Sequence, residues 1–235
     1  MVQKESARRG RPRSYDPDTA LAQAMTVFWR AGYSGTSLDD ITAGTGLNRP
    51  SLYGAFGDKH ALYLQTLERY WQAGRAGLAE ALSRDVPLRE ALRRVYERAL
   101  SLYLPSDDGA RGCFLIGTAL TEAALDADVR KLLRDALHDF DSAFEERIRY
   151  AREQGQLPRN VDTAGLARMA SAALHTLAIR SRMGEPRKML EATIDAALDL
   201  ICGTTRPEGS RRPRPAPVRT HSPSSKAKRS SRSHR

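Results

Sequence analysis

Residues 36–59 carry the start and stop signals of two short helices joined by a glycine turn, in the order TSLDDITAGTGLNRPSLYGAFGDK. Thr36 or Ser37 can cap the first helix, and the aspartates that follow face the positive end of its dipole. The segment Gly44-Thr45-Gly46 then ends this helix, because glycine adopts the backbone angles that a tight reversal requires. This stretch therefore predicts two helices that pack across a short turn.

The second helix of the pair has one apolar and one polar side. Asn48 is a suitable cap, and Pro50 falls in the first turn, where no backbone N–H is needed. Leu52 and Phe56 stand four residues apart and form the buried side. The opposite side carries Arg49, Ser51, Tyr53 and Gly54. The pattern predicts a helix-turn-helix whose second helix enters a DNA major groove, and the alternative is a helical hairpin in an ordinary α-helical core.

The flanking sequence extends this pattern. Its characteristic positions are Leu21, Ala24, Phe28, Gly32-Tyr33, Thr36-Ser37, Ile41, Gly46-Leu47, Leu52-Tyr53, Phe56, Lys59 and Leu62. In order and spacing, from about residue 19 to residue 62, they resemble the N-terminal domain of the TetR/AcrR family of bacterial transcriptional regulators. The resemblance implies an all-α protein with an N-terminal three-helix DNA-binding domain and a larger C-terminal helical domain for ligand binding and dimerisation.

The resemblance also implies which residues meet DNA. They are Thr36, Ser37, Asn48, Arg49, Pro50, Ser51, Tyr53, Gly54 and Lys59. Arg49 is the only long cationic side chain on the exposed side of the second helix, and arginine pairs bidentately with guanine. Tyr53 and Lys59, with Thr36 and Ser37, are expected to contact phosphates.

Hydrophobic periodicity places about nine helices along the chain and no strand. The expected domains are a basic arm (1–15), the helix-turn-helix domain (16–62), the ligand-binding and dimerisation domain (63–202) and a basic tail (203–235). Within the larger domain, one helix from Gly112 to about Leu125 is apolar almost all round and is expected to be buried.

Aromatic and apolar residues at helical spacing predict a ligand chamber in the larger domain, and the alternative is a packed core. The candidates are Tyr70, Trp71, Tyr96, Leu100, Tyr103, Cys113, Phe114, Phe140, Phe144, Leu174 and His175, with His138 as a second possible polar anchor. Cys113 lies at the expected start of a helix, whose dipole lowers a thiol pKa and favours redox or electrophile sensing. The alternative is a small core hydrophobe.

The last two helices carry more apolar surface than two peripheral helices need. The resemblance implies that they form a four-helix bundle with a partner subunit, and the alternative is that they cover their own domain. The expected interface residues are Leu166, Ala170, Ala173, Leu177, Leu190, Ile194, Ala197, Leu198 and Ile201.

Motifs of enzymes and cofactor sites are absent from the sequence. The five histidines form no HExxH, and there is no GxSxG, P-loop, GxGxxG or CxxC. No apolar run approaches the length of a membrane span. We therefore expect no enzyme, no cofactor, no metal and no membrane partner, and a cytoplasmic, nucleoid-associated bacterial protein.

These patterns together predict a sequence-specific regulator. The expected function is a repressor that binds a near-palindromic operator as a homodimer and is released by a small-molecule effector. The alternative is a largely ligand-independent architectural DNA-binding protein driven by the basic arms.

The net charge of +10 is concentrated at the two ends of the chain. Residues 1–15 carry +4 and residues 203–235 carry +9, whereas the 187 residues between them carry −3. The first segment is expected to contact phosphates, or else to be a solubilising tail. The last segment is rich in Ser and Pro and contains no aromatic residue, so it is expected to stay disordered.

Removal of residues 206–235 tests whether the tail acts on DNA. A cationic tail releases counterions without choosing among sequences, so truncation should weaken non-specific binding and leave the operator sequence unchanged. The salt slope should become shallower by several units, at about 0.9 per phosphate neutralised. A salt titration of both proteins on operator and random DNA measures this, and identical slopes would show that the tail is a bystander.

Overall fold

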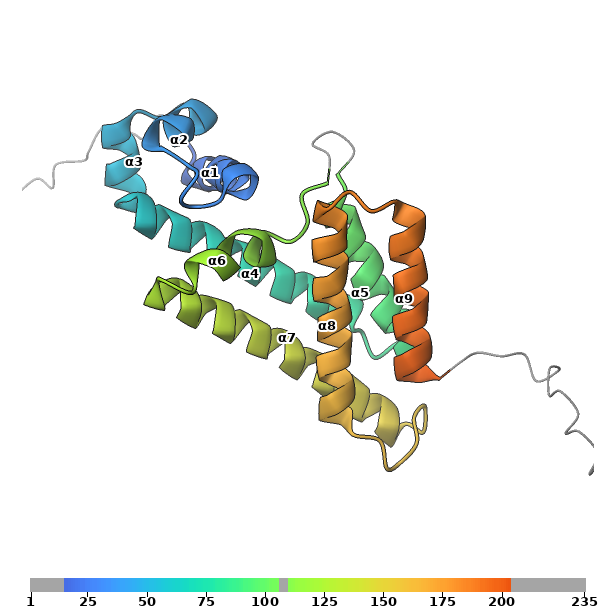
Figure 1. The fold of residues 1–235 in the computed structure, drawn as a ribbon. Helices are drawn as coiled ribbons and strands as arrows, with labels where there is room; N and C mark the ends of the chain where they lie inside the picture. Colours follow the sequence, from blue (N-terminus) through green and yellow to red (C-terminus); the bar gives the residue numbers. More distant parts are fainter. Residues whose placement is uncertain (1–14, 106–109, 204–235) are drawn as a thin grey trace, which may run out of the picture. The chain divides into compact units, whose positions relative to one another are not determined.

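The computed structural model describes residues 15–105 and 110–203. These residues form nine α-helices and one π-helical turn and contain no strand, which confirms the predicted all-α fold. The helices are α1 (Pro17–Ala31), α2 (Leu38–Thr45), α3 (Arg49–Phe56), α4 (Lys59–Ala81), α5 (Leu88–Tyr103), η1 (Leu115–Ala119), α6 (Leu120–Glu122), α7 (Ala127–Glu153), α8 (Thr163–Arg182) and α9 (Arg187–Cys202) (Figure 1). All but the first residue of the predicted tail, and all but the last residue of the predicted arm, lie outside the described residues.

Side-chain caps start each of the first four helices, and those at Ser37 and Asn48 are among the caps expected from the sequence. Asp16, Asn48 and Asp58 each accept a hydrogen bond from a backbone N–H in the first turn of α1, α3 and α4. Ser37 caps α2 in a reciprocal box: its hydroxyl oxygen accepts from the Asp40 N–H at 3.1 Å, and its own N–H donates to the Asp40 carboxylate at 2.8 Å. These local bonds fix where each short helix of the DNA-binding domain begins.

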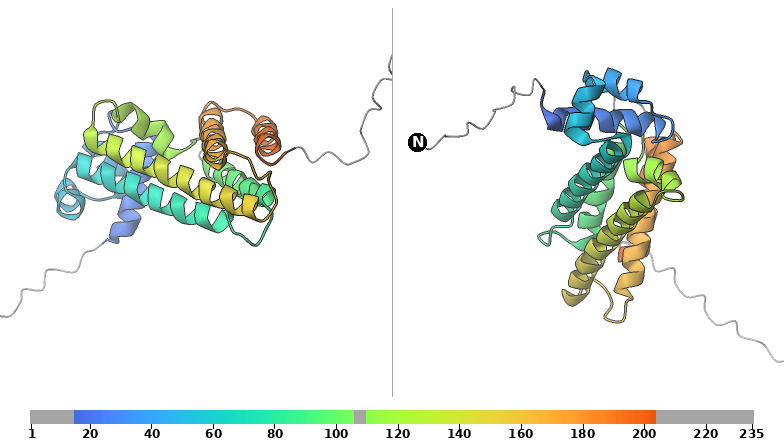
Figure 2. Two further views of the ribbon diagram at one scale, coloured as in Figure 1. Left: turned by 90° about the horizontal axis from the view of Figure 1, so that it is seen from below. Right: turned by 90° about the vertical axis from the view of Figure 1, so that its left-hand side faces the viewer.

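The long helix α4 leads from the α1–α3 unit into the larger domain. It contacts α1 and α3 near its start and α5 and α7 further along (Figure 1). Helix α7 runs beside it in both views of the molecule (Figure 2). Helix α8 packs against α5, α7 and α9, so the larger domain is a helical bundle built onto the end of α4.

The hydrophobic core does not stop at the expected domain boundary. One cluster of buried residues contains Phe28 of α1 and Ile41 of α2, and continues through Tyr63 of α4 to Phe114 and to Val129 of α7. The DNA-binding domain therefore shares a continuous core with the start of the larger domain.

The expected helix from Gly112 to about Leu125 is shorter and less buried than its composition indicates. It begins at Phe114, widens into the π-helical turn η1 and ends with the three-residue α6. Leu120 and Leu125 are 58% and 89% exposed, so the prediction of all-round burial is wrong. The turn is fixed by the Thr118 hydroxyl, which donates to the Phe114 carbonyl at 2.8 Å and accepts from the Tyr63 hydroxyl at 3.0 Å.

Replacement of Asp58 by Ala tests the cap of α4. Because Asp58 accepts from the Ala61 N–H at 2.8 Å, its loss should lower the free energy of unfolding by about 1 kcal/mol. Asp58→Ser, which keeps a capping oxygen, should retain most of the stability. Chemical denaturation at one fixed protein concentration measures the difference, and equal stabilities of Asp58→Ala and the wild type would contradict the assignment.

Candidate DNA-binding surface and ligand pocket

Helix α3 presents one side to solvent and buries the other. Leu52 and Phe56 are 3% and 6% exposed, because they pack into the core under the helix. The exposed side carries Arg49, Pro50, Tyr53 and Gly54, with Ser51 partly exposed at its edge. A Cβ atom built on Gly54 would meet nothing within 4 Å, so the surface at this point is open. The arrangement is that of a recognition helix with a free face.

Arg49 is held by an acidic neighbour from the preceding helix. Its Nη2 lies 2.8 Å from Oδ1 of Asp39, and both side chains are more than half exposed. An exposed ion pair of this kind contributes little to stability, so the guanidinium remains available to exchange this partner for a base edge.

The two residues expected to contact phosphates at the start of α2 differ in accessibility. Thr36 is only 2% exposed, and its hydroxyl donates to the Gly32 carbonyl at 2.6 Å. Its side chain is therefore committed to the turn after α1 and does not reach the surface, contrary to the prediction. Ser37 is exposed, and its hydroxyl belongs to the cap of α2. Asn48 is likewise exposed and caps α3 through the Ser51 N–H at 2.9 Å.

Lys59 begins α4 beside the recognition helix. Its Nζ lies 4.3 Å from the centre of the Tyr33 ring, an arrangement in which the aromatic face stabilises the cation. Lys59 is partly buried, and the contact with Tyr33 directs its ammonium group. This position suits a phosphate contact next to the groove-entering helix.

A pocket of about 530 Å³ opens between α1, α4, α5, α7, α8 and the start of η1 with the residue Cys113 before it. Six of the eleven residues predicted for a ligand chamber line it: Tyr70, Tyr103, Cys113, Phe140, Leu174 and His175. The exposed His138 is not among the lining residues.

The other five candidates do not line this pocket. Tyr96, Leu100, Phe114 and Phe144 are fully buried, and Tyr96 donates its hydroxyl to the Ala170 carbonyl at 3.1 Å. Trp71 is half-buried and packs against the core that the DNA-binding domain shares. These residues belong to a packed core, which was the alternative to a ligand chamber. Helical spacing indicates that a helix face is buried, but it does not indicate whether that face lines a cavity or packs against other side chains.

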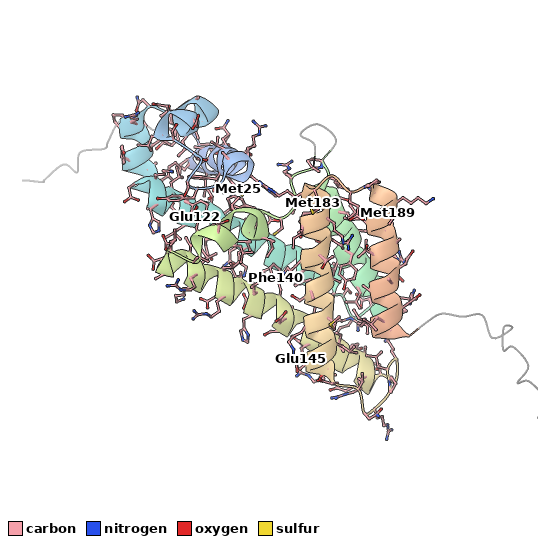
Figure 3. The ribbon with its side chains drawn as sticks, viewed as in Figure 1. Met25, Glu122, Phe140, Glu145, Met183 and Met189 are labelled. Atoms are coloured by element: carbon pink, nitrogen blue, oxygen red, sulfur yellow. The ribbon has the colours of Figure 1, made fainter. Side chains whose placement is uncertain are left out.

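Two pocket residues come from the DNA-binding domain itself. Met25 and Trp29 stand four residues apart on α1 and line the pocket together with residues of the larger domain, such as Phe140 of α7. Met25 and Phe140 are labelled in Figure 3. The Trp29 indole N–H donates to the Arg111 carbonyl at 3.2 Å. The sequence carries a signal for this second apolar side of α1 in the spacing of Met25 and Trp29, but it does not show what that side faces.

Burial sets the ionisation of the polar groups in the pocket. It raises the pKa of the Tyr70 and Tyr103 hydroxyls well above their usual value and lowers that of His175 from its usual 6.5. The hydroxyls therefore remain protonated donors, and the imidazole is neutral at pH 7.

Cys113 also faces this pocket. Desolvation raises the pKa of its thiol, and this outweighs the opposing hydrogen bonds from the Tyr70 hydroxyl and from the backbone at the start of η1. The expectation of a thiol pKa lowered by a helix dipole is therefore wrong.

Helices α8 and α9 carry two apolar sides each. Of the nine expected interface residues, Ala170, Leu177, Leu190, Ile194, Leu198 and Ile201 are at most 3% exposed within one protomer. They belong to the core of the larger domain and are not available to a partner, and Leu166, Ala173 and Ala197 are partly buried beside them. The exposed large apolar residues on these helices are instead Met169, Ile179, Met183, Met189 and Leu200.

One group of described residues combines a histidine with carboxylates. The side chains of His60, Asp126 and Asp128 lie within 4.8 Å of one another. Asp126 already caps α7 through the N–H groups of Asp128 and Val129, and its second oxygen lies 2.6 Å from His60 Nε2. The arrangement is explained as a link between the first turn of α4 and the first turn of α7.

Among the helices that the structure describes, none is long and apolar enough to cross a membrane.

Comparisons with known proteins agree on one family. Residues 20–66 match the family described as bacterial regulatory proteins, tetR family, and residues 87–197 match the tetracyclin repressor-like C-terminal domain. The chain is 26% identical to the uncharacterized HTH-type transcriptional regulator YezE of Bacillus subtilis, over 82% of this chain and 99% of the relative. It is 29% identical to the HTH-type transcriptional repressor ComR of Escherichia coli, over 75% of this chain and 84% of the relative.

Solved structures show the same relationship. A cysteine mutant of the TetR family transcriptional regulator CifR, complexed with a 26-base-pair operator DNA, superposes with a TM-score of 0.73 at 32% identity. The match covers 80% of this chain and 98% of that one. With a matching DNA-binding domain, a matching C-terminal domain and an exposed recognition helix, the chain belongs to the TetR family of DNA-binding transcriptional regulators, which are not enzymes.

Proposed function

We propose that this regulator is a repressor that binds a near-palindromic operator as a homodimer and is released when a small molecule fills the pocket. The relatives ComR and BdcR of Escherichia coli are named repressors, and CifR was complexed with operator DNA. One observation supports release by a ligand: α1 of the DNA-binding domain forms part of the pocket wall through Met25 and Trp29. We call this part of the pocket the shared wall.

The shared wall provides a direct route from ligand to DNA-binding domain. A molecule in the pocket contacts Trp29, whose indole N–H bonds to the Arg111 carbonyl. Arg182 at the end of α8 donates to the same carbonyl at 3.1 Å. A ligand that prefers a different position of α1 lowers operator affinity by the difference between its affinities for the two states.

The homodimer is supported by two apolar stripes, each at helical spacing. On α8 the stripe consists of Met169, Ala172, Ile179 and Met183, and on α9 of Met189, Ala192, Ala196 and Leu200, all exposed. Met183 and Met189 lie near each other where α8 ends and α9 begins (Figure 3). Stripes of this size on two adjoining helices match the interface of a helical bundle with a second copy. The interface that we propose is therefore the outer side of α8 and α9, in place of the buried residues expected from the sequence.

Replacement of Ile179 by Asp tests this interface. A carboxylate in the middle of the α8 stripe would be desolvated on association, so the dimer should dissociate at concentrations at least about tenfold higher. Leu125→Asp is the matched control, because Leu125 is 89% exposed and lies outside α8 and α9. Analytical ultracentrifugation measures both variants, and an unchanged dimer in Ile179→Asp would contradict the proposed face.

Substitutions of Arg49 and Lys59 distinguish a side chain that reads bases from one that contacts phosphates. Arg49→Ala should weaken operator binding by about 1–3 kcal/mol and relax the preference at one base pair. Lys59→Ala should weaken operator and random DNA alike and reduce the salt slope by about one unit. Competition binding at several salt concentrations separates the two effects. If Arg49→Ala lowers both affinities equally, Arg49 does not read bases.

Mapping of the protected DNA tests the function as a whole. Purified protein should protect a near-palindromic site, with half-sites spaced to match the two-fold axis of the dimer. A reporter placed behind that site should be silent with the wild type and active with Arg49→Ala. Protection without sequence preference would favour the architectural alternative, and a reporter that needs the protein for expression would identify an activator.

A further inference from the structure

The charges around the pocket have one sign. Among the described residues that line it, the charged side chains are Arg69 of α4 and Arg98 of α5, and none is an aspartate or glutamate. Arg69 donates from Nη1 to Asp18 of α1 at 2.6 Å, so it is engaged with the DNA-binding domain. Arg98 is paired as well, but at the longer distance of 3.1 Å to Glu80 and with a partner in the larger domain, so it is the cation that we assign to a ligand.

Arg98 lies against the wall of the pocket at Gly77. A Cβ atom built on Gly77 would be 2.6 Å from Nε of Arg98, a distance that real Cβ atoms essentially never show. Glycine at this position lets the guanidinium rest on α4, whereas a larger residue would require the Arg98 side chain to shift, and both residues line the pocket. The missing side chain thus makes room for a charge at the pocket, where a larger residue would have displaced it.

The present partner of Arg98 is easily exchanged. Arg98 Nη1 donates to Glu80 Oε2 at 3.1 Å, and the two side chains are 58% and 74% exposed. An ion pair this exposed contributes little to stability, so a ligand anion can replace Glu80 without a large penalty. The bond to Glu80 uses one nitrogen of Arg98, whereas arginine can bind a carboxylate through two parallel N–H donors, so a ligand carboxylate can gain a second bond.

The rest of the pocket suits an apolar body. Trp29, Tyr70 and Phe140 supply aromatic walls, and a Cβ on Gly74 would lie 3.4 Å from the Phe140 ring. The neutral His175 and the protonated hydroxyls of Tyr70 and Tyr103 provide polar contacts without adding charge. A volume of about 530 Å³ accommodates a ligand of two fused rings.

We propose that the pocket takes an apolar organic acid, whose aromatic or aliphatic body packs against Trp29, Tyr70 and Phe140 and whose carboxylate is bound by Arg98. This assignment rests on the proposed function, since it names the chemical class of the effector for the same pocket. A cationic drug-like molecule is disfavoured, because the described lining offers no carboxylate to bind it.

A pair of isosteric probes tests the charge preference directly. Naphthaleneacetate and naphthaleneacetamide share one ring system and have similar size. They differ in that the first carries a charged carboxylate and the second a neutral carboxamide. Equilibrium dialysis of the full-length protein against each should show the acid binding about fivefold tighter than the amide, as expected for one exposed ion pair. Binding of both with equal affinity, tighter binding of the amide, or no binding of either at millimolar concentration would overturn the proposal.

Two charge variants of opposite sign locate the preference. In Arg98→Gln the acid-to-amide ratio should fall to about one, whereas Arg98→Lys should retain part of it. In Glu80→Gln the ratio should rise, because the competing carboxylate is gone. Arg94→Gln is the matched control: Arg94 lies on the same helix, pairs with Glu90 and does not line the pocket. A ratio that stays constant in Arg98→Gln, or that falls equally in Arg94→Gln, would exclude Arg98 as the anion-binding group.

Operator binding is measured separately, and it distinguishes a failure of the proposed ligand class from a failure of the proposed function. Loss of the acid preference with intact sequence-specific DNA binding would refute the ligand class alone. An acid that binds with the expected preference but leaves operator affinity unchanged would refute ligand release and keep the ligand class. The dialysis contains no DNA, so its result does not depend on whether the protein represses.

Discussion

The packing of Phe114 joins the two functional parts of this molecule. Its ring, which is fully buried, lies 5.4 Å from Trp29 of α1, and 6.2 Å and 5.7 Å from Tyr63 and Tyr70 of α4. Aromatic pairs in such arrangements contribute about 0.5–1.5 kcal/mol each beyond the area that they bury. Because Phe114 belongs to the segment that becomes η1, the turn beside the pocket is part of the same core as the DNA-binding domain. Trp29 and Tyr70, which line the pocket, therefore pack against the same ring as the core of the DNA-binding domain.

The parts of the structure that local chemistry determines were predictable from the sequence. Asp16, Asn48, Asp58 and Asp162 start their helices through bonds to residues two or three positions away, and such bonds need no tertiary information. The exposed side of α3 followed from residue spacing, and the family and its fold followed from the resemblance of residues 19–62 to a known family. Thr36 shows where prediction from local signals ends. Its hydroxyl was expected at the surface, but it donates to the Gly32 carbonyl and closes the turn after α1.

The parts that depend on which side of a helix faces which neighbour were not predictable. Helices α8 and α9 have two apolar sides, and hydrophobic periodicity does not say which one meets α5 and which one meets solvent. The larger side chains Leu177, Leu190 and Leu198 were assigned to the partner but fill the protomer core. The stripe through Met169 and Met183 mixes methionine with small residues and gives a weaker signal. The role of α1 in the pocket was missed for the same reason, because contacts between distant helices leave no local trace.

The polar links between the domains are weaker than the aromatic core, and this difference makes a small ligand effective. Ser34 bonds to Glu122 at 2.8 Å, His60 to Asp126 at 2.6 Å and Trp29 to the Arg111 carbonyl at 3.2 Å. Each contributes about 0.5–1.5 kcal/mol, and several lie at the surface, where water replaces them readily. A tenfold change in operator affinity needs a differential affinity of about 1.4 kcal/mol between two positions of α1. A ligand can supply this by exchanging one or two such links while the packing around Phe114 persists. In the function that we propose, a shift of the DNA-binding domain of this kind changes the spacing of the two recognition helices in the dimer.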